Sequence, residues 1–288
     1  MKIQIFSDLH TEFSAFTPSI AGGVDAVVLA GDIGSHPRML HRWAALCESC
    51  GADLVFVAGN HEFYGRHHER ALLQLREEAE AVCGPMAGRV HVLEHDAVVI
   101  GGVRFLGATA WTDFTACGDA PERVAEAMFE ARLCMADFGE ILVGPVQRMW
   151  GGRAQARMTP EHQAALSRAA RAWFTERLLE AFEGPTVVVT HHAPALACID
   201  TATHRARFPT SLLDAAYANS WDRVGMQGEP ALLGPACDLA RPPDLWVYGH
   251  SHIAGRLQHG RTLCVSNPRG YPSEGSGTGF EPILTFTL

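Results

Sequence analysis

FSDLHTEF, residues 6–13, follows directly on the apolar start MKIQI. The stretch places Asp8 and His10, two side chains that bind metals well, where a first β-strand over Lys2–Phe6 is predicted to end. A single Asp-x-His occurs by chance in many proteins. It therefore indicates a site only if other parts of the chain supply partners for it.

The composition is that of an ordinary globular protein, with 47% hydrophobic and 19% charged residues among 288. This length suits one large α/β domain or two small ones. The net charge of −9, from 23 basic and 32 acidic residues, argues against a nucleic-acid partner, because such binding needs basic patches to neutralise phosphates. A small phosphorylated substrate is compatible with this charge where a local cation offsets it.

Three features favour a cytoplasmic protein with no membrane partner. The N-terminus lacks the long apolar segment and the cleavage site of a signal peptide, and no run of about 18 apolar residues follows. The eight cysteines are scattered, so they are expected to be reduced thiols. Cys47 and Cys50 form a CxxC that could be a redox or zinc pair, but they share a predicted helix face with Trp43, which favours core packing. Nothing indicates an oligomeric state.

The first third of the chain alternates short apolar runs with helical patterns. Strands are predicted over Lys2–Phe6, Ala26–Leu29 and Leu54–Val57, and helices over Pro37–Cys50 and His67–Val82. This order implies parallel strands joined by right-handed crossovers.

The later pattern adds antiparallel or mixed pairing, because short strands follow one another with tight turns at Val90–Leu93, Ala97–Ile100 and Val103–Gly107. A long amphipathic helix is predicted over Gln163–Phe182, before a strand at Thr186–Thr190. The last predicted strands are Asp244–Tyr248, Thr262–Val265 and Ile283–Phe286. The fold class is therefore α/β.

The segment at about 113–160 has a different pattern, with short helical pieces and paired glycines. It is too short to bury a core of its own, so residues 1–288 are expected to form a single domain with an inserted, cap-like segment there. Residues 274–279, EGSGTG, resemble a Gly-rich phosphate loop. They lack the preceding strand and following helix that such a loop needs, which favours a flexible loop.

Ligand-type side chains follow five of the predicted strands, often beside a glycine: Asp8 and His10, Asp32, Asn60 with His61 and Glu62, His191 with His192, and His250 with His252. Taken singly, each has a commoner explanation as a helix cap, a turn former or a solvated histidine. Taken together, they indicate one site, because ligand sites of α/β sheets form at the carboxyl edge of the strands.

The donor atoms are carboxylate oxygens, an amide oxygen and imidazole nitrogens, without a thiolate. This set suits zinc, iron or manganese. Seven ligands, as the resemblance described below selects them from these side chains, are too many for one tetrahedral centre and suit two ions about 3.5–4 Å apart, bridged by one carboxylate.

The motifs D-x-H, G-D, G-N-H-E, H and G-H-x-H occur in this order over residues 8–252, and the chain resembles the calcineurin-like metallophosphoesterase superfamily. The resemblance implies a four-layer α/β/β/α sandwich with two facing mixed β-sheets. It is closest to small bacterial members, which share a Trp-Thr-Asp-Phe stretch, here Trp111–Phe114, and an Asn-Pro-Arg-Gly-Tyr stretch, here Asn267–Tyr271.

The resemblance also implies roles for single residues. One metal ion is assigned to Asp8, His10, Asp32 and His252, and the second to Asp32 as the bridge with Asn60, His191 and His250. His61 is left without a metal beside the substrate, as the general acid. His192 either reaches the substrate or supports its neighbour.

The function implied is hydrolysis of a small phosphomonoester or phosphodiester by in-line attack of a metal-bridging hydroxide, with two ions of manganese, iron or zinc as cofactors. Protein phosphatases of this superfamily carry Gly-Asp-x-Val-Asp-Arg-Gly, whereas this chain has Ile33, Gly34, Ser35 and His36 after Asp32. A phosphoprotein substrate is therefore disfavoured, and the sequence offers no evident carboxylate to orient His61.

Arg269 and Tyr271 are further candidates for binding the substrate, with His192. Arg269 follows a predicted strand, and a planar guanidinium grips phosphate oxygens in bidentate fashion. Two rival functions remain open. One is a serine hydrolase using Ser251, although Ile253 stands where the nucleophile elbow needs glycine. The other is a non-catalytic scaffold on the same fold.

Overall fold

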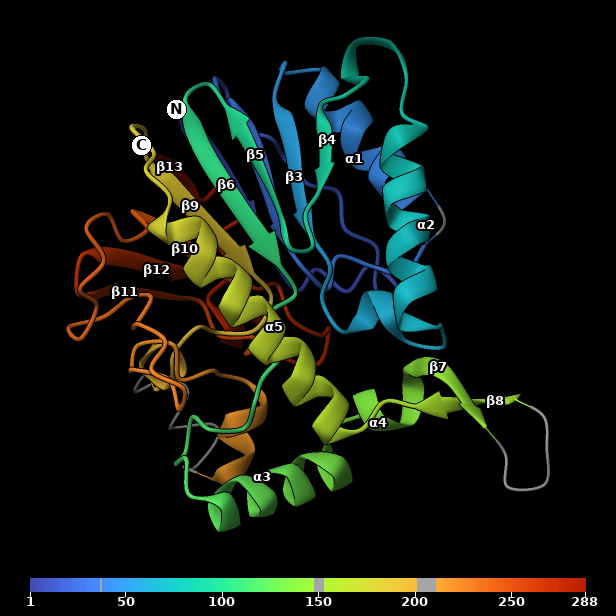
Figure 1. Cartoon of the computed structure of the whole chain (residues 1–288). Coiled ribbons are helices and arrows are strands. Elements are labelled where there is room, and N and C mark those ends of the chain that lie inside the picture. The colour runs from blue at the N-terminus through green and yellow to red at the C-terminus, as the bar shows by residue number, and fades with distance from the viewer. Residues whose placement is uncertain (37, 148–152, 201–210) are drawn as a thin grey trace.

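Two β-sheets face each other between helices in the computed structural model, which describes residues 1–36, 38–147, 153–200 and 211–288 (Figure 1). The first sheet has the order β13-β1-β2-β3-β4. Its strands are parallel except for β13, which pairs antiparallel with β1. Their bounds are β1 Lys2–Phe6, β2 Ala26–Ala30, β3 Asp53–Val57, β4 Val90–Val92 and β13 Thr285–Thr287.

The second sheet has the order β11-β12-β10-β9-β6-β5. Its four central strands are parallel, and the two edge strands β5 and β11 are antiparallel to their neighbours. Their bounds are β5 Asp96–Ile100, β6 Val103–Ala108, β9 Thr186–Thr190, β10 Leu245–Tyr248, β11 Gly255–His259 and β12 Thr262–Ser266. Both sheets are therefore mixed.

Alternation along the strands explains the layers, because successive side chains point to opposite faces. Ile5 and Val28 of the first sheet pack against the second sheet in a core that also holds Val187. Facing outward, Phe6 meets Trp43 of α1 at 5.3 Å between ring centroids.

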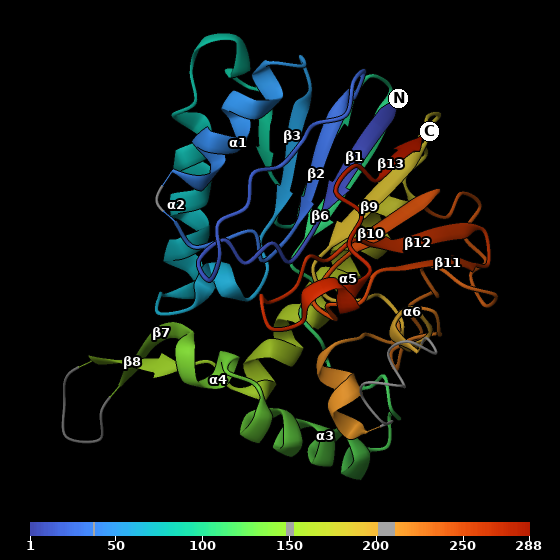
Figure 2. The same ribbon diagram turned by 180° about the vertical axis from the view of Figure 1, so that it is seen from behind.

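The outer helices complete four layers. Helices α1 (Met39–Glu48) and α2 (His68–Glu80) cover the first sheet, as Figure 2 shows from behind. On the second sheet, Trp246 lies 5.9 Å from Phe174 of α5 (Pro160–Leu179), measured between ring centroids. The prediction of a four-layer sandwich is confirmed. Strands buried on both faces also explain the nearly continuous apolar runs in the sequence.

The segment at about 113–160 lies outside both sheets, on the side toward which the parallel strands run (Figure 1). It forms α3 (Pro121–Cys134), α4 (Asp137–Glu140) and a hairpin of β7 (Leu142–Gln147) with β8 (Arg153–Arg157). Residues 148–152 lie outside the described part of the chain. Helix α3 packs against η3 (Leu212–Ala216) and α5. The other short helices are η1 His61–Phe63, η2 Gly84–Met86, α6 Leu196–Ile199 and η4 Gly275–Thr278.

Most predicted boundaries are shifted by one to three residues, the strands β7, β8 and β11 are not predicted from the sequence, and two of the shifts have clear local reasons. Helix α5 begins at Pro160, because the Thr159 hydroxyl accepts a hydrogen bond from the His162 amide and proline is favourable at the first helical position. The last strand begins at Thr285, because the Leu284 amide is bonded to the Glu281 carbonyl in a turn. Within the described ranges, no helix has both the length and the apolar character to cross a bilayer.

Asn267 joins the two sheets where β12 ends. The side chain is fully buried, and its amide nitrogen donates to the carbonyls of Ile5 at 2.8 Å and Glu281 at 2.9 Å. Its amide oxygen accepts from the Glu281 backbone N–H at 2.9 Å. One side chain thus satisfies three backbone groups, a buried one of β1 and two partly buried ones of the C-terminal segment.

Replacing Asn267 by alanine is expected to lower the free energy of unfolding by about 2–4 kcal/mol, because the buried Ile5 carbonyl and two partly buried groups of Glu281 lose their partner. Urea unfolding followed by circular dichroism measures the change. Gln258→Ala is the matched control, since Gln258 is exposed and makes one hydrogen bond, to the Gly260 carbonyl. We expect its effect to stay within about 0.5 kcal/mol. Equal effects of the two substitutions would contradict the role assigned to Asn267.

Candidate metal centre

The carboxyl ends of five strands, from both sheets, bring seven buried side chains together: Asp8 and His10 after β1, Asp32 after β2, Asn60 after β3, His191 after β9, and His250 and His252 after β10. Their ligand atoms form two groups, each within 4.8 Å: Asp8, His10, Asp32 and His252 in one, and Asp32, His191 and His250 in the other. Asp32 belongs to both groups. Asn60 adjoins the second, with its Oδ1 atom 3.0 Å from His191 Nε2.

The closest contact within the first group joins the two sheets. His10 Nε2 lies 2.9 Å from His252 Nε2. The other ring nitrogens face carboxylates, with His10 Nδ1 at 3.1 Å from Glu12 and His252 Nδ1 at 2.7 Å from Glu274. An Nδ1–H donated to a carboxylate leaves Nε2 as a lone pair. Two lone pairs at this distance repel each other, so the contact needs either a proton or a metal ion between the two nitrogens.

In the second group, too, a hydrogen bond from one ring nitrogen orients the other nitrogen toward the centre. His191 Nδ1 donates to the Ala30 carbonyl at 2.9 Å, so Nε2 points at Asp32 Oδ2, 3.4 Å away. The buried polar atoms without a hydrogen-bond partner in the described chain include His250 Nε2 of this group and Asp8 Oδ2 of the first group. Buried acceptors without donors are costly, and a cation satisfies them. The residues therefore fit metal ions that take nitrogen and oxygen ligands.

The backbone at this centre is unusual. Five of the seven residues have left-handed φ angles: Asp8 49°, His10 45°, Asp32 55°, His250 68° and His252 52°. Such angles are uncommon outside glycine, although Asp and His tolerate them better than most residues. Non-glycine residues in this region cluster at functional sites, where the surrounding structure holds them.

Three neighbouring positions require glycine, because side-chain atoms of the candidate ligands lie too close to their Cα atoms for a Cβ atom to fit. A Cβ atom on Gly31 would lie 2.4 Å from His191 Nδ1, and one on Gly59 would lie 2.1 Å from Asp32 Oδ1. A Cβ on Gly249 would lie 2.6 Å from Asp8 Oδ2. The glycine beside each of these ligand motifs therefore makes room for a ligand that another strand supplies.

Glu62 fixes the loops after β2 and β3 to each other. Its carboxylate accepts four backbone N–H groups, from Asp32 (2.9 Å), Ile33 (2.9 Å), Gly34 (3.1 Å) and Gly59 (2.6 Å). Burial, together with the nearby Asp32 carboxylate, raises the pKa of Glu62 to about 7. This residue orients the backbone around Asp32.

His61 stands beside the two groups and has a carboxylate partner that sequence analysis did not find. Its Nδ1 atom lies 3.1 Å from Glu12 Oε1, and its Nε2 atom lies 3.0 Å from the Tyr271 hydroxyl. Burial lowers the pKa of His61, but the Asp32 carboxylate and the hydrogen bond to Glu12 outweigh it and raise the pKa to about 9. The expectation that no carboxylate orients His61 is therefore corrected.

Asn60 is oriented by the inserted segment. Its Nδ2 atom donates to Asp137 Oδ1 and to the Tyr64 hydroxyl, both at 2.9 Å, and that hydroxyl donates to Asp137 at 2.6 Å. These bonds leave Oδ1 of Asn60 facing His191 and the second group. Asp137 lies on α4 and is fully buried, a role that its sequence context did not indicate.

The three predicted substrate residues lie in different places. Tyr271 lines the cavity beside the centre. His192 is buried behind His250, 4.2 Å between ring centroids, and burial with the neighbouring His191 lowers its pKa to about 3. Arg269 donates to the carbonyls of Leu9 (2.9 Å) and Ser14 (3.1 Å). It thus anchors the loop after β1, a different role from the predicted grip on phosphate.

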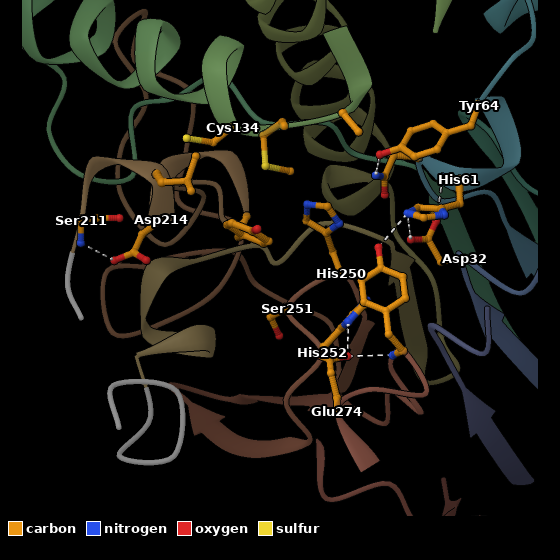
Figure 3. Close-up of a pocket in the computed structure, with 16 residues that line it drawn as sticks. Asp32, His61, Tyr64, Cys134, Ser211, Asp214, His250, Ser251, His252 and Glu274 are labelled. Carbon is orange, nitrogen blue, oxygen red and sulfur yellow. Dashed lines mark hydrogen bonds and ion pairs between the residues drawn. The ribbon is translucent and has the colours of Figure 1, made fainter. Parts of the chain in front are cut away.

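The cavity has a volume of about 630 Å³ and opens onto the centre. Asp32 and His61 lie at one side of it, and Ser211 and Asp214 lie at the opposite side, near Cys134 (Figure 3). His250, Ser251 and His252 lie between these two sides (Figure 3).

Replacing Asp137 by alanine is expected to weaken any metal binding at the second group by 10- to 100-fold, because Asn60 loses the partner that orients its amide. Calorimetric titration of the metal-free protein measures both affinities. Glu140→Ala on the same helix, at an exposed position, is the matched control and should leave both unchanged. Affinities that Asp137→Ala leaves within twofold would contradict this role.

Comparison with known proteins gives a consistent result. Residues 1–118 match the calcineurin-like phosphoesterase superfamily domain. Uncharacterized protein L509 of Acanthamoeba polyphaga mimivirus is 17% identical over 250 residues, which cover 86% of this chain and 79% of that protein.

Among solved structures, the phosphopantetheinyl hydrolase of Mycobacterium tuberculosis superposes with a TM-score of 0.58 at 18% identity, covering 95% of this chain and 90% of that one. A putative 5′-nucleotidase of Staphylococcus aureus gives a TM-score of 0.45 at 12% identity, covering 93% of this chain and 49% of that one. The first likeness is one of fold. Residues 1–118 therefore carry a match to the calcineurin-like phosphoesterase superfamily domain, and the chain as a whole shares its two-sheet fold with the phosphopantetheinyl hydrolase.

Proposed function

We propose that this protein is a dinuclear metal-dependent phosphoesterase that hydrolyses a small phosphomonoester or phosphodiester. The observation that carries the proposal is the position of Asp32, whose carboxylate belongs to two adjoining groups of buried ligand atoms. A carboxylate so placed can bridge two ions. The superfamily supports phosphoester hydrolysis in general.

Under this proposal, Asp8, His10, Asp32 and His252 hold one ion, and Asp32, Asn60, His191 and His250 hold the other. Their oxygen and nitrogen donors suit manganese, iron or zinc. Two ions bound there would lower the pKa of a shared water toward about 7 and offset charge on the phosphoryl oxygens. The buried polar atoms without partners, His250 Nε2 and Asp8 Oδ2, support this occupancy.

His61 is the proposed general acid. Glu12 accepts its Nδ1–H, which leaves Nε2 directed at the Tyr271 hydroxyl and at Asp32 Oδ2, 3.9 Å away. As water attacks phosphorus opposite the leaving oxygen, His61 Nε2–H gives its proton to that oxygen, so the leaving group departs as a neutral alcohol. Tyr271 is close enough to share this hydrogen bonding.

The structure also bears on the two rival functions, the serine hydrolase and the non-catalytic scaffold. Ser251 lines the cavity, but within the described residues its hydroxyl makes no hydrogen bond to a histidine, which a serine nucleophile needs. A scaffold without activity has no use for the complete ligand set and His61. Inhibition by chelators together with resistance to serine-directed phosphonates distinguishes the phosphoesterase from the serine hydrolase.

The proposal also covers the cellular location and the class of substrate. A cytoplasmic location is supported by the cysteines, since no disulfide joins any two of them in the described chain. The net charge of −9 supports a small substrate over nucleic acid. Because the fold resembles a phosphopantetheinyl hydrolase, a phosphopantetheinyl diester belongs among the test substrates, beside aryl monoesters, aryl diesters and nucleotides.

Metal loading should stabilise the protein, because ions that bind only the folded state add about 2.7 kcal/mol per site at 100 times Kd. Differential scanning calorimetry of chelator-treated protein, with and without Mn²⁺, measures this gain. Asp32→Asn should lose most of it together with hydrolysis of aryl phosphates. Asp96→Asn, an exposed control on β5, should retain both. Full activity of Asp32→Asn would refute the dinuclear arrangement.

His61→Ala should keep both ions and lose about 10²- to 10⁴-fold in kcat, because a general acid is removed and the ligands remain. Metal content by mass spectrometry and kcat on an aryl phosphate are the paired measurements. Glu12→Gln, which keeps an acceptor for His61, should lose less activity than Glu12→Ala. The half-exposed His41→Ala is the control. Loss of an ion from His61→Ala would identify His61 as a ligand instead.

A further inference from the structure

The far wall of the cavity differs in character from the metal centre. It is built by the end of α3 and by η3, two helices that pack against each other. The wall contributes Cys134, Met135 and Leu213, while Tyr217 lies between wall and centre. Tyr217 also stacks on His250, with 4.8 Å between ring centroids. The cavity is therefore continuous from the ligand atoms to an apolar surface.

Size and charge restrict what this surface can bind. A volume of about 630 Å³ is typical of pockets that enclose a whole small molecule, and it exceeds what a phosphate group alone fills. The described lining residues include the acidic Asp214 and Glu274 but no lysine or arginine. Away from His61 and His252, a group with several negative charges would therefore meet carboxylates and no cationic side chain on the described lining residues.

The wall is also connected to the centre through the chain. Met135 lines the cavity, and two residues later Asp137 fixes the Asn60 amide. A ligand that contacts Met135 therefore has a fixed position relative to the second group of metal ligands. This connection makes the organic group of the substrate the fitting occupant of the wall.

We propose, on the basis of the phosphoesterase function above, that the α3–η3 wall binds the organic group of the substrate. The substrate class is a phosphoester whose organic group is elongated, uncharged and largely apolar. The inserted segment then acts as a cap that selects the substrate, and Met135 and Leu213 are its main contacts.

The test uses alkyl phosphates and p-nitrophenyl alkyl phosphates, each from methyl to octyl, with the metal-loaded full-length protein. Within each series the scissile bond stays chemically similar, so chain length changes only the apolar contact. We expect kcat/KM to rise with length by up to about fourfold per methylene, the equivalent of about 0.8 kcal/mol for a buried CH₂. A flat dependence, with clear turnover of the methyl ester, overturns the inference and leaves the phosphoesterase function standing.

Variants locate the effect on the wall. Leu213→Ala and Met135→Ala should reduce the rise of kcat/KM with chain length. Leu133→Ala, whose side chain is 70% exposed on α3, is the matched control and should keep the full dependence. An undiminished dependence in both wall variants would overturn the assignment to this surface.

If no ester is hydrolysed, the affinity for non-hydrolysable phosphonates tests the α3–η3 wall independently of the phosphoesterase function. Affinities of methyl to octyl phosphonates for the metal-loaded protein are measured by calorimetry. A rise with chain length that Leu213→Ala abolishes supports the wall, even where the lack of turnover has refuted the phosphoesterase function. Affinities that do not depend on chain length overturn the inference.

Discussion

The structure of the site depends on the approach of His10 Nε2 to His252 Nε2, at 2.9 Å. One histidine follows a strand of the first sheet and the other a strand of the second, so this contact marks where the two sheets meet. Both rings present a nitrogen lone pair there, because each directs its other nitrogen at a carboxylate. A proton or a metal ion between the two nitrogens makes such an approach favourable. The sandwich thus places, at one edge, an arrangement that is stable only around positive charge.

Acidic residues behind the ligands supply the orientation. Glu12 contacts both His10 and His61, so one carboxylate aligns a ligand and the proposed acid. Glu274 holds His252, and Glu62 gathers four backbone amides around the loop of Asp32. Such supporting contacts fix ring orientation and tautomer, which the ligands alone cannot do. The segment at about 113–160 contributes through Asp137, which accepts a hydrogen bond from the Asn60 amide.

The layers and the strand ends could be predicted because their signals are local. An apolar run followed by glycine and a ligand-type residue identifies both a strand and its carboxyl end, as at Gly31-Asp32. The supporting carboxylates could not be predicted in this way, because their partners are distant in sequence: 49 positions separate Glu12 from His61, and 77 separate Asn60 from Asp137. Glu274 was hidden in a stretch expected to be a flexible loop, although η4 follows it directly. For Arg269, a turn sequence does not say which side the guanidinium faces, and the loop at Ser14 offers it carbonyls and a hydroxyl.

The left-handed backbone at five ligands has a consequence for how this centre can change. Two requirements therefore limit which residue types each of these positions accepts. The side chain has to offer a suitable donor atom, and the residue has to tolerate a positive φ angle. Glutamate and cysteine coordinate the same metals as aspartate and histidine, yet a left-handed conformation costs most L-residues about 1–2 kcal/mol. Substitutions at these positions are thereby limited to Asp, Asn, His and Gly. Any redesign toward softer metals would have to rebuild the loops first and exchange the ligands second.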